Sequence, residues 1–145
     1  MFEMRYPATI RQDSPGKDWV VRFKDLEGAL TGAATFEEAL DEAADCLGSW
    51  LAFRMLDKGE IPKSSTPRRK EFLISVPLWI APKVALYREL AAQGLSNSEL
   101  ARRLKVRETV VRRMLDPDHA TKAAKIEAAL RAVGKRLLVA VDDAA

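Results

Sequence analysis

Residues 96–117, SNSELARRLKVRETVVRRMLDP, contain two short helical segments on either side of a two-residue turn. Ser96 is followed by Glu99 in the spacing of a capping box, where each side chain satisfies a free backbone N–H at the start of a helix. Asp116 and Pro117 then break the second segment. The pattern predicts a helix, a turn and a second helix over residues 97–104, 105–106 and 108–115.

Apolar side chains of this stretch recur where two crossing helices would face each other. Ala101 lies where such helices need a small side chain, so the pattern is that of a helix-turn-helix, whose second helix enters the DNA major groove. Two features depart from it: Lys105 occupies the turn position where glycine is commonest, and Arg107 is a poor N-cap. The side chains expected to point inward are Leu100, Leu104, Val106, Val111 and Met114.

The outward positions are polar and mostly basic. Arginine can pair with guanine O6 and N7, and glutamate can accept from cytosine N4. Side chains at the start of the first helix can meet a phosphate. Residues 97–136 hold 11 Lys and Arg against 5 Asp and Glu. DNA binding is the favoured interpretation and a solvated basic surface is the alternative. The candidate DNA-binding residues are Asn97, Ser98, Arg107, Glu108, Thr109, Arg112 and Arg113.

The front of the chain has a different pattern, which is typical of strands. MRYPATIR alternates between apolar and polar residues, with Pro7 suggesting an edge strand. A capping box at Thr35 starts a long helix that we expect to end near Lys58, with Gly59 as a left-handed cap. The other expected strands are WVVRF, ALTGAA and EFLISVP, over residues 19–23, 29–34 and 71–77.

These elements predict an α+β fold with two domains. Residues 1–77 form a βββαβ domain, in which the helix covers one face of an antiparallel sheet. Residues 78–145 form an all-α helix-turn-helix domain, which a short strand, RLLVAV, closes at residues 136–141. At this size the first domain is near the lower limit for an independent core, so self-association would help it.

Composition narrows the functional classes. The 145 residues carry a net charge of +3, but residues 1–77 have 11 basic against 13 acidic residues, and residues 78–145 have 13 against 8. The basic excess therefore lies in the domain expected to meet DNA.

The sequence contains no apolar run of about 18 residues, so we expect no membrane span. The N-terminus lacks signal-peptide character, and a single cysteine, Cys46, fits a reducing, cytoplasmic setting.

Several front motifs together resemble the HicB family of antitoxins. These are a Tyr-Pro pair in the first strand, an aromatic second strand, an Asp-Leu-x-Gly turn, a Thr-x-Glu-Glu-Ala-Leu helix start and a later Ile-Pro pair. One departure is Ala29, where the family often has cysteine. The matching residues are Tyr6-Pro7, Trp19, Asp25 to Gly28, Thr35 to Leu40 and Ile61-Pro62.

The resemblance implies a fold, two partners and no cofactor. Domains of the HicB kind are similar to a truncated RNase H fold without catalysis, and they mask a HicA-like toxin that cleaves mRNA. The rear domain would bind double-stranded operator DNA and repress the shared operon. The individual toxin-binding residues stay unidentified. We expect a homodimer or higher even-numbered oligomer, formed through exposed sheet edges or through Leu137–Val141.

Two other functions remain to be weighed. An RNase H-like nuclease needs carboxylates converging on metal ions, yet Met4 to Arg11 contains no Asp or Glu. The single histidine, His119, fits a surface or phosphate-contacting role, so we expect no enzyme, no catalytic residue and no metal site. The main rival is a stand-alone helix-turn-helix repressor whose N-terminal domain only dimerises or senses a ligand.

Overall fold

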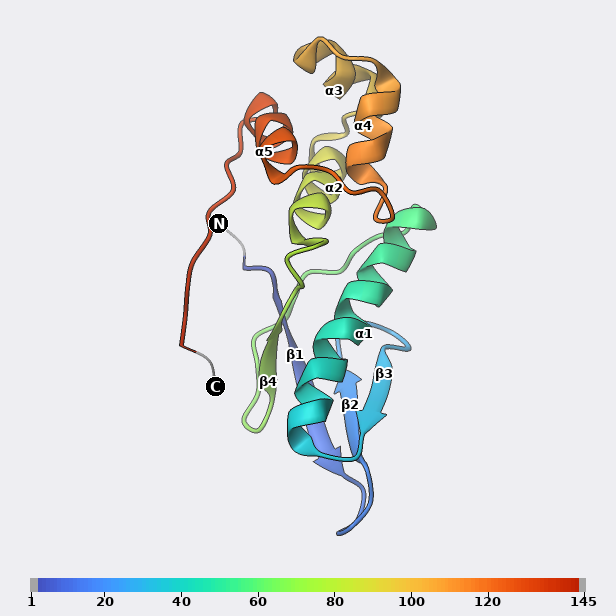
Figure 1. Cartoon of the computed structure of the whole chain (residues 1–145), viewed down its shortest axis with the longest axis vertical. Helices are drawn as coiled ribbons and strands as arrows, with labels where there is room; N and C mark the ends of the chain where they lie inside the picture. Colours follow the sequence, from blue (N-terminus) through green and yellow to red (C-terminus); the bar gives the residue numbers. More distant parts are fainter. Residues whose placement is uncertain (1–2, 144–145) are drawn as a thin grey trace. The chain divides into compact units, whose positions relative to one another are not determined.

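A computed structural model describes residues 3–143, and the chain divides into two compact units, Met1–Ala81 and Pro82–Ala145. The first, called the front unit, holds a four-stranded sheet and one long helix, and the second, called the helical unit, holds short helices (Figure 1). This confirms the predicted α+β class. The elements are β1 (Arg5–Gln12), β2 (Trp19–Phe23), β3 (Leu30–Ala33), α1 (Phe36–Leu56), β4 (Phe72–Ser75), α2 (Ala81–Gln93), α3 (Asn97–Leu104), α4 (Glu108–Leu115) and α5 (Ala123–Ala132).

The sheet has the order β3-β2-β1-β4 with every neighbouring pair antiparallel, and α1 lies across one of its faces (Figure 1). The expectation that Pro7 marks an edge strand is wrong, because β1 lies between β2 and β4. Pro7 is opposite Leu73 of β4, and pairing with β2 begins only at Ala8. The missing N–H of proline therefore falls outside the β1–β2 ladder and costs it no hydrogen bond.

Helix α1 starts as its sequence predicts. The Thr35 hydroxyl accepts a hydrogen bond from the Glu38 N–H at 3.2 Å, which caps the first turn. One side of the helix is buried against the sheet, through Ala39, Ala43, Leu47, Leu51 and Met55. The opposite side is exposed and acidic, which confirms that its carboxylates form a solvated face: Glu37, Glu38, Asp41, Glu42 and Asp45.

The end of α1 differs from the prediction by one residue. Lys58, not Gly59, takes the left-handed conformation, with φ of 54°. The Gly59 N–H donates to the Arg54 carbonyl at 2.8 Å, and the Lys58 N–H donates to the Met55 carbonyl at 3.2 Å. This is the bond pattern of a Schellman motif, and it places the residue before the glycine in the left-handed position.

The helical unit has its own apolar core. Leu95, which precedes the N-cap of α3, is partly buried and packs against this core. Gly94 ends α2 with φ of 64°, a conformation that glycine adopts without steric cost. The buried side chains come from all four helices and from the residue after α5: Ala85, Leu86, Leu90, Leu100, Ala101, Val111, Met114, Ile126, Ala129, Leu130 and Val133.

The segment after α5 corrects one prediction. No strand forms between Lys135 and Asp143, although RLLVAV has strand-like composition. Leu138, Val139 and Val141 are 64%, 78% and 97% exposed. A strand needs a neighbour to accept and donate its backbone hydrogen bonds, and within the described residues this segment has none. Within residues 3–143, no helix is both long and apolar enough to cross a membrane.

Candidate nucleic-acid interface

The two helices of the predicted helix-turn-helix begin and end at the predicted residues, Asn97–Leu104 and Glu108–Leu115. The Ser96 hydroxyl accepts from the Glu99 N–H at 3.1 Å, so the predicted N-cap of α3 is confirmed, while the Glu99 carboxylate pairs with Arg102 at 2.9 Å. Arg107 precedes α4 and makes no side-chain cap, as expected for arginine. Because Leu100 and Val111 are fully buried, the inner faces of α3 and α4 are held together by the core.

The turn between α3 and α4 holds an unusual conformation. Lys105 is left-handed, with φ of 56° and ψ of 43°. Its N–H donates to the Arg102 carbonyl at 3.2 Å, and the Val106 N–H donates to the Ala101 carbonyl at 3.0 Å, again as in a Schellman motif. The expectation that Val106 points into the core is wrong, since it is 38% exposed. Val106 follows Lys105 in the turn between the two helices, where its side chain is only partly covered.

Replacing Lys105 by glycine is expected to stabilise the helical unit by about 0.5–1 kcal/mol. A left-handed residue with a Cβ costs roughly 1–2 kcal/mol, and the greater chain entropy of glycine offsets about half of that gain. Lys125→Gly, within α5 and exposed, is the matched control and should destabilise by about 1 kcal/mol. Urea unfolding followed by far-ultraviolet circular dichroism measures both, and destabilisation by Lys105→Gly would contradict the turn geometry.

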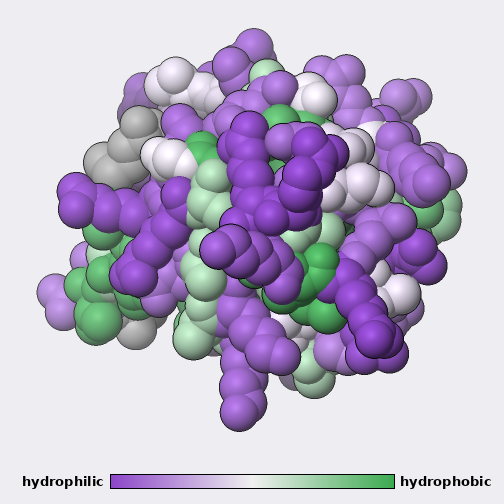
Figure 2. Space-filling model, turned by 90° about the horizontal axis from the view of Figure 1, so that it is seen from above, coloured by the Kyte–Doolittle hydropathy of each residue, from purple (hydrophilic) through white to green (hydrophobic). Residues whose placement is uncertain are grey.

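The candidate DNA-binding residues gather on α4 and at the start of α3. Five of them, Arg107, Glu108, Thr109, Arg112 and Arg113, are exposed. Ser98 is exposed and Asn97 is half-buried beside the N-terminal end of α3. Figure 2 views the helical unit from the side on which Figure 1 draws α3 and α4, and hydrophilic side chains predominate on the face that it shows. The arrangement can present cationic and hydrogen-bonding groups to a polyanion.

The arginines of α3 and α4 differ in the ion pairs and hydrogen bonds that their guanidinium groups make. Arg103 lies 3.7 Å from the Glu99 carboxylate and donates to the Ala132 carbonyl at the end of α5, so it joins helices. Arg112 pairs with Glu108 at 3.1 Å, and its side chain stays 66% exposed. Within residues 3–143, the guanidinium groups of Arg107 and Arg113 have no ion-pair or hydrogen-bond partner. These two are the groups most available to a ligand.

One residue near this surface was missed by sequence reasoning. Lys83, in the first turn of α2, is only 3% exposed, and its ammonium lies beside the end of α4. Burial lowers the pKa of Lys83, and the Asp116 carboxylate partly opposes that shift. Lysine in a first helical turn is ordinarily solvated, so nothing in the spacing of α2 marks this side chain as buried.

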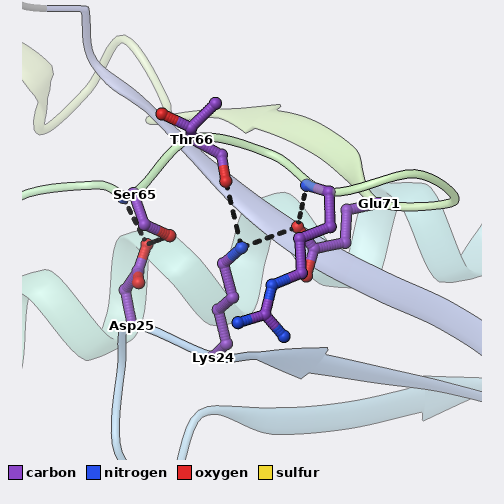
Figure 3. Close-up of polar contacts among 6 residues, drawn as sticks. Lys24, Asp25, Ser65, Thr66 and Glu71 are labelled. Atoms are coloured by element: carbon purple, nitrogen blue, oxygen red, sulfur yellow. Dashed lines mark hydrogen bonds and ion pairs between the residues drawn. The ribbon is translucent and has the colours of Figure 1, made fainter.

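The front unit contains a second polar cluster, which ties the end of β2 to the loop before β4 (Figure 3). The Lys24 ammonium donates to the Thr66 carbonyl at 3.1 Å and to the Glu71 carboxylate at 2.8 Å. The Asp25 carboxylate accepts from the Ser65 N–H at 2.8 Å and from its hydroxyl at 3.0 Å. Two adjacent residues after β2 therefore fix a segment about forty residues further along the chain.

These contacts give the Asp-Leu-x-Gly stretch a structural role. The Ala29 N–H donates to the Leu26 carbonyl at 3.0 Å, which makes a tight turn, and Leu26 is buried. The Trp50 ring N–H of α1 donates to the Glu27 carbonyl at 3.0 Å. The backbone N–H of Arg68 and the Lys24 ammonium hold the pKa of Glu71 below its usual range. The loop before β4 is thus anchored by charged groups.

The described residues, 3–143, do not assemble a catalytic centre of the RNase H kind. β1 carries no Asp or Glu, and residues 3–143 contain no group of three or more His, Cys, Asp or Glu placed to hold a metal ion. Burial raises the pKa of the Cys46 thiol, with the Glu42 carboxylate adding to the effect. A thiol shifted in this direction is a poor nucleophile at neutral pH.

The family model and the relatives found by comparison with known proteins all point to the same family. A family model of the HicB-like antitoxin of bacterial toxin–antitoxin systems matches residues 5–85. Antitoxin HicB 2 of Photorhabdus laumondii is 42% identical over 139 residues, covering 95% of this chain and 97% of the relative. Antitoxin HicB of Escherichia coli is 34% identical over 134 residues, covering 92% and 96%. Antitoxin HicB of Pseudomonas fluorescens is 34% identical over 145 residues, covering 99% and 97%.

Proposed function

The chain belongs to the HicB-like antitoxin family, and from this premise we propose that it neutralises a HicA-like toxin and represses its own operon. Its role as an antitoxin, an inhibitory partner rather than an enzyme, comes with the family. We assign toxin binding to the front unit and operator binding to the helical unit. Both partners of such a protein would lie in the cytoplasm.

The observation that carries the DNA-binding half is the geometry of α3 and α4. Their inner faces are buried through Leu100, Val111 and Met114, which leaves the other face of α4 free to enter the major groove. Arg112 and Arg113 would read base edges from that face. Asn97 and Ser98 would meet a phosphate at the N-terminal end of α3, where free N–H groups favour anions.

The proposal that the front unit binds a toxin is supported by the family and by the exposed surface of this unit. A toxin that cleaves mRNA has a surface for RNA, and an antitoxin can silence it by covering that surface. The exposed side of α1 carries five carboxylates, so it is an anionic surface suited to oppose an RNA-binding face. A homodimer or higher even-numbered oligomer would match the two-fold symmetry common to operators.

Replacing Arg112 or Arg113 by alanine is expected to weaken operator binding by about 1–3 kcal/mol each, since each loses a contact to a base. Toxin neutralisation should not change. Arg131→Ala is the matched control, because Arg131 lies on α5, is 70% exposed and pairs with Glu127 like Arg112 with Glu108. Fluorescence anisotropy with duplexes from the operon's upstream region measures the effect. Unchanged affinity in both variants would refute the assignment of α4 as the recognition helix.

The rival proposal is a stand-alone repressor whose front unit only dimerises or senses a ligand. It predicts no neighbouring gene for a toxin. A short adjacent reading frame that encodes a small basic protein, and that halts growth when expressed alone, would exclude this rival.

A further inference from the structure

The starting observation is the buried ammonium of Lys83. Lys83 is 3% exposed, and Val84 and Leu86, which lie close to it in α2, are fully buried. A lysine is almost never buried unless partners satisfy its charge. Here the ammonium donates to the Arg113 carbonyl at 3.0 Å, the Asp116 carbonyl at 2.6 Å and the Thr121 hydroxyl at 3.1 Å. Each of its three N–H groups therefore has an acceptor.

All three acceptors belong to the C-terminal end of α4 and to the loop that follows it. The last carbonyls of a helix have no partner within the helix, and a cation there also opposes the negative end of the helix dipole. The Arg113 carbonyl accepts two further hydrogen bonds, from the Asp116 N–H at 3.2 Å and the Thr121 hydroxyl at 3.3 Å. This carbonyl is thus a junction between α4, the loop and α2.

We infer that Lys83 is a positioning residue for base reading: its ammonium fixes the end of α4 and so sets where Arg112 and Arg113 reach in the major groove. The inference rests on the proposed operator binding. A bidentate pairing of arginine with guanine tolerates little displacement, because both hydrogen bonds must be short and aligned at once. Contacts to phosphates are less demanding, since they act largely through charge.

An apolar side chain would be the ordinary occupant of this position. Methionine has a similar length and avoids the loss of hydration that lowers the pKa of Lys83. It would leave the Arg113 and Asp116 carbonyls and the Thr121 hydroxyl without this donor, and the end of α4 would be less restrained. The buried Lys83 ammonium therefore holds the end of α4 in one position, and the loss of its hydration is the energetic cost.

The test compares two duplexes in the full chain carrying Lys83→Met. One duplex is the region upstream of the operon, and the other is an unrelated duplex of equal length. We expect the Kd for the upstream duplex to rise about tenfold or more, as after loss of a base contact, and the Kd for the unrelated duplex to change less than about twofold. A general loss of folded protein would weaken both in parallel. Lys125→Met, on an exposed position of α5, should change neither.

Thr121 supplies a milder pair of variants in case Lys83→Met does not fold. Thr121→Val keeps the shape and removes the hydroxyl, and should raise the Kd for the upstream duplex about threefold to tenfold. Thr121→Ser keeps the hydroxyl and should stay within about twofold of the wild type. In a folded Lys83→Met chain, either wild-type selectivity or a parallel loss on both duplexes would overturn the inference. Equal behaviour of the two Thr121 variants would overturn it as well.

A measurement without DNA separates this inference from the proposed function. The amides of Asp116 and His119 donate to the Arg113 and Asp116 carbonyls, so their hydrogen exchange reports on the end of α4. Lys83→Met and Thr121→Val should accelerate this exchange about tenfold and leave the amides of α3 unchanged. Unchanged exchange would overturn the inference even if the wild type binds DNA. A wild type that binds neither duplex would instead refute operator binding.

Discussion

A chain cut after Ala81 is expected to lose all measurable operator binding and still to neutralise its toxin. The cut removes the candidate DNA-reading surface but leaves the sheet, α1 and their shared core intact. Ile80 is fully buried, and the Ile80 and Ala81 amides donate to the Pro77 carbonyl at 3.1 and 2.9 Å. The front unit therefore ends at this short turn, and we expect the fragment to fold.

A cut after Pro77 is the matched comparison. It removes Ile80, and loss of a fully buried isoleucine costs about 2–5 kcal/mol, so this shorter fragment should unfold at a lower temperature. It also removes Trp79, whose ring packs against Gly48 of α1. Growth rescue after co-expression with the toxin measures neutralisation, and mobility shift measures DNA binding. A folded fragment ending at Ala81 that fails to rescue growth would show that the units do not act separately.

Leu100→Ala is expected to destabilise the helical unit by about 2–5 kcal/mol, because its fully buried side chain would leave a cavity between helices. For a unit of this size, such a loss is comparable with the whole stability. Operator binding should fall with the folded fraction, and toxin neutralisation should persist. Leu138→Ala, at a position 64% exposed, is the control and should change stability by less than about 0.5 kcal/mol.

The placement of the tryptophans makes the two units separately observable. Trp19, Trp50 and Trp79 all lie in the front unit, so tryptophan fluorescence follows that unit. Circular dichroism near 222 nm follows the helices of both. In Leu100→Ala, the circular dichroism transition should gain an early phase while the fluorescence transition stays at the wild-type denaturant concentration. A fluorescence transition that moves equally would contradict independent unfolding of the units.

The sequence predicted those parts of the fold that local chemistry specifies. The hydroxyls of Thr35 and Ser96 mark helix starts because each can accept a backbone N–H three residues later, and both do so. The bounds of α3 and α4 follow from such signals and from the spacing of Leu100, Val111 and Met114. The exposed positions of α4 were predicted for the same reason, and their contact with DNA stays a prediction.

The remaining features depend on groups that are distant in the chain. Pro7 lies in an inner strand because pairing with β2 starts at the next residue, which no local pattern reveals. Lys83 is buried because three oxygens from α4 and its loop surround its ammonium. Lys58 and Lys105 take left-handed conformations that glycine would usually occupy, since the following residues complete the helix ends. The terminal RLLVAV segment lacks a partner among the described residues, so strand propensity alone could not form a strand.

The measurement that tests the central claim most directly is a gentle pull-down of the tagged full chain from its native cells, followed by intact mass analysis of what co-elutes. The account predicts a small basic protein in stoichiometric amount, encoded beside this chain, whose expression alone halts growth. This small protein should co-elute whether or not the helical unit is present. A preparation that contains only this chain, although its neighbouring genes are expressed, would contradict the account and leave the front unit without a toxin.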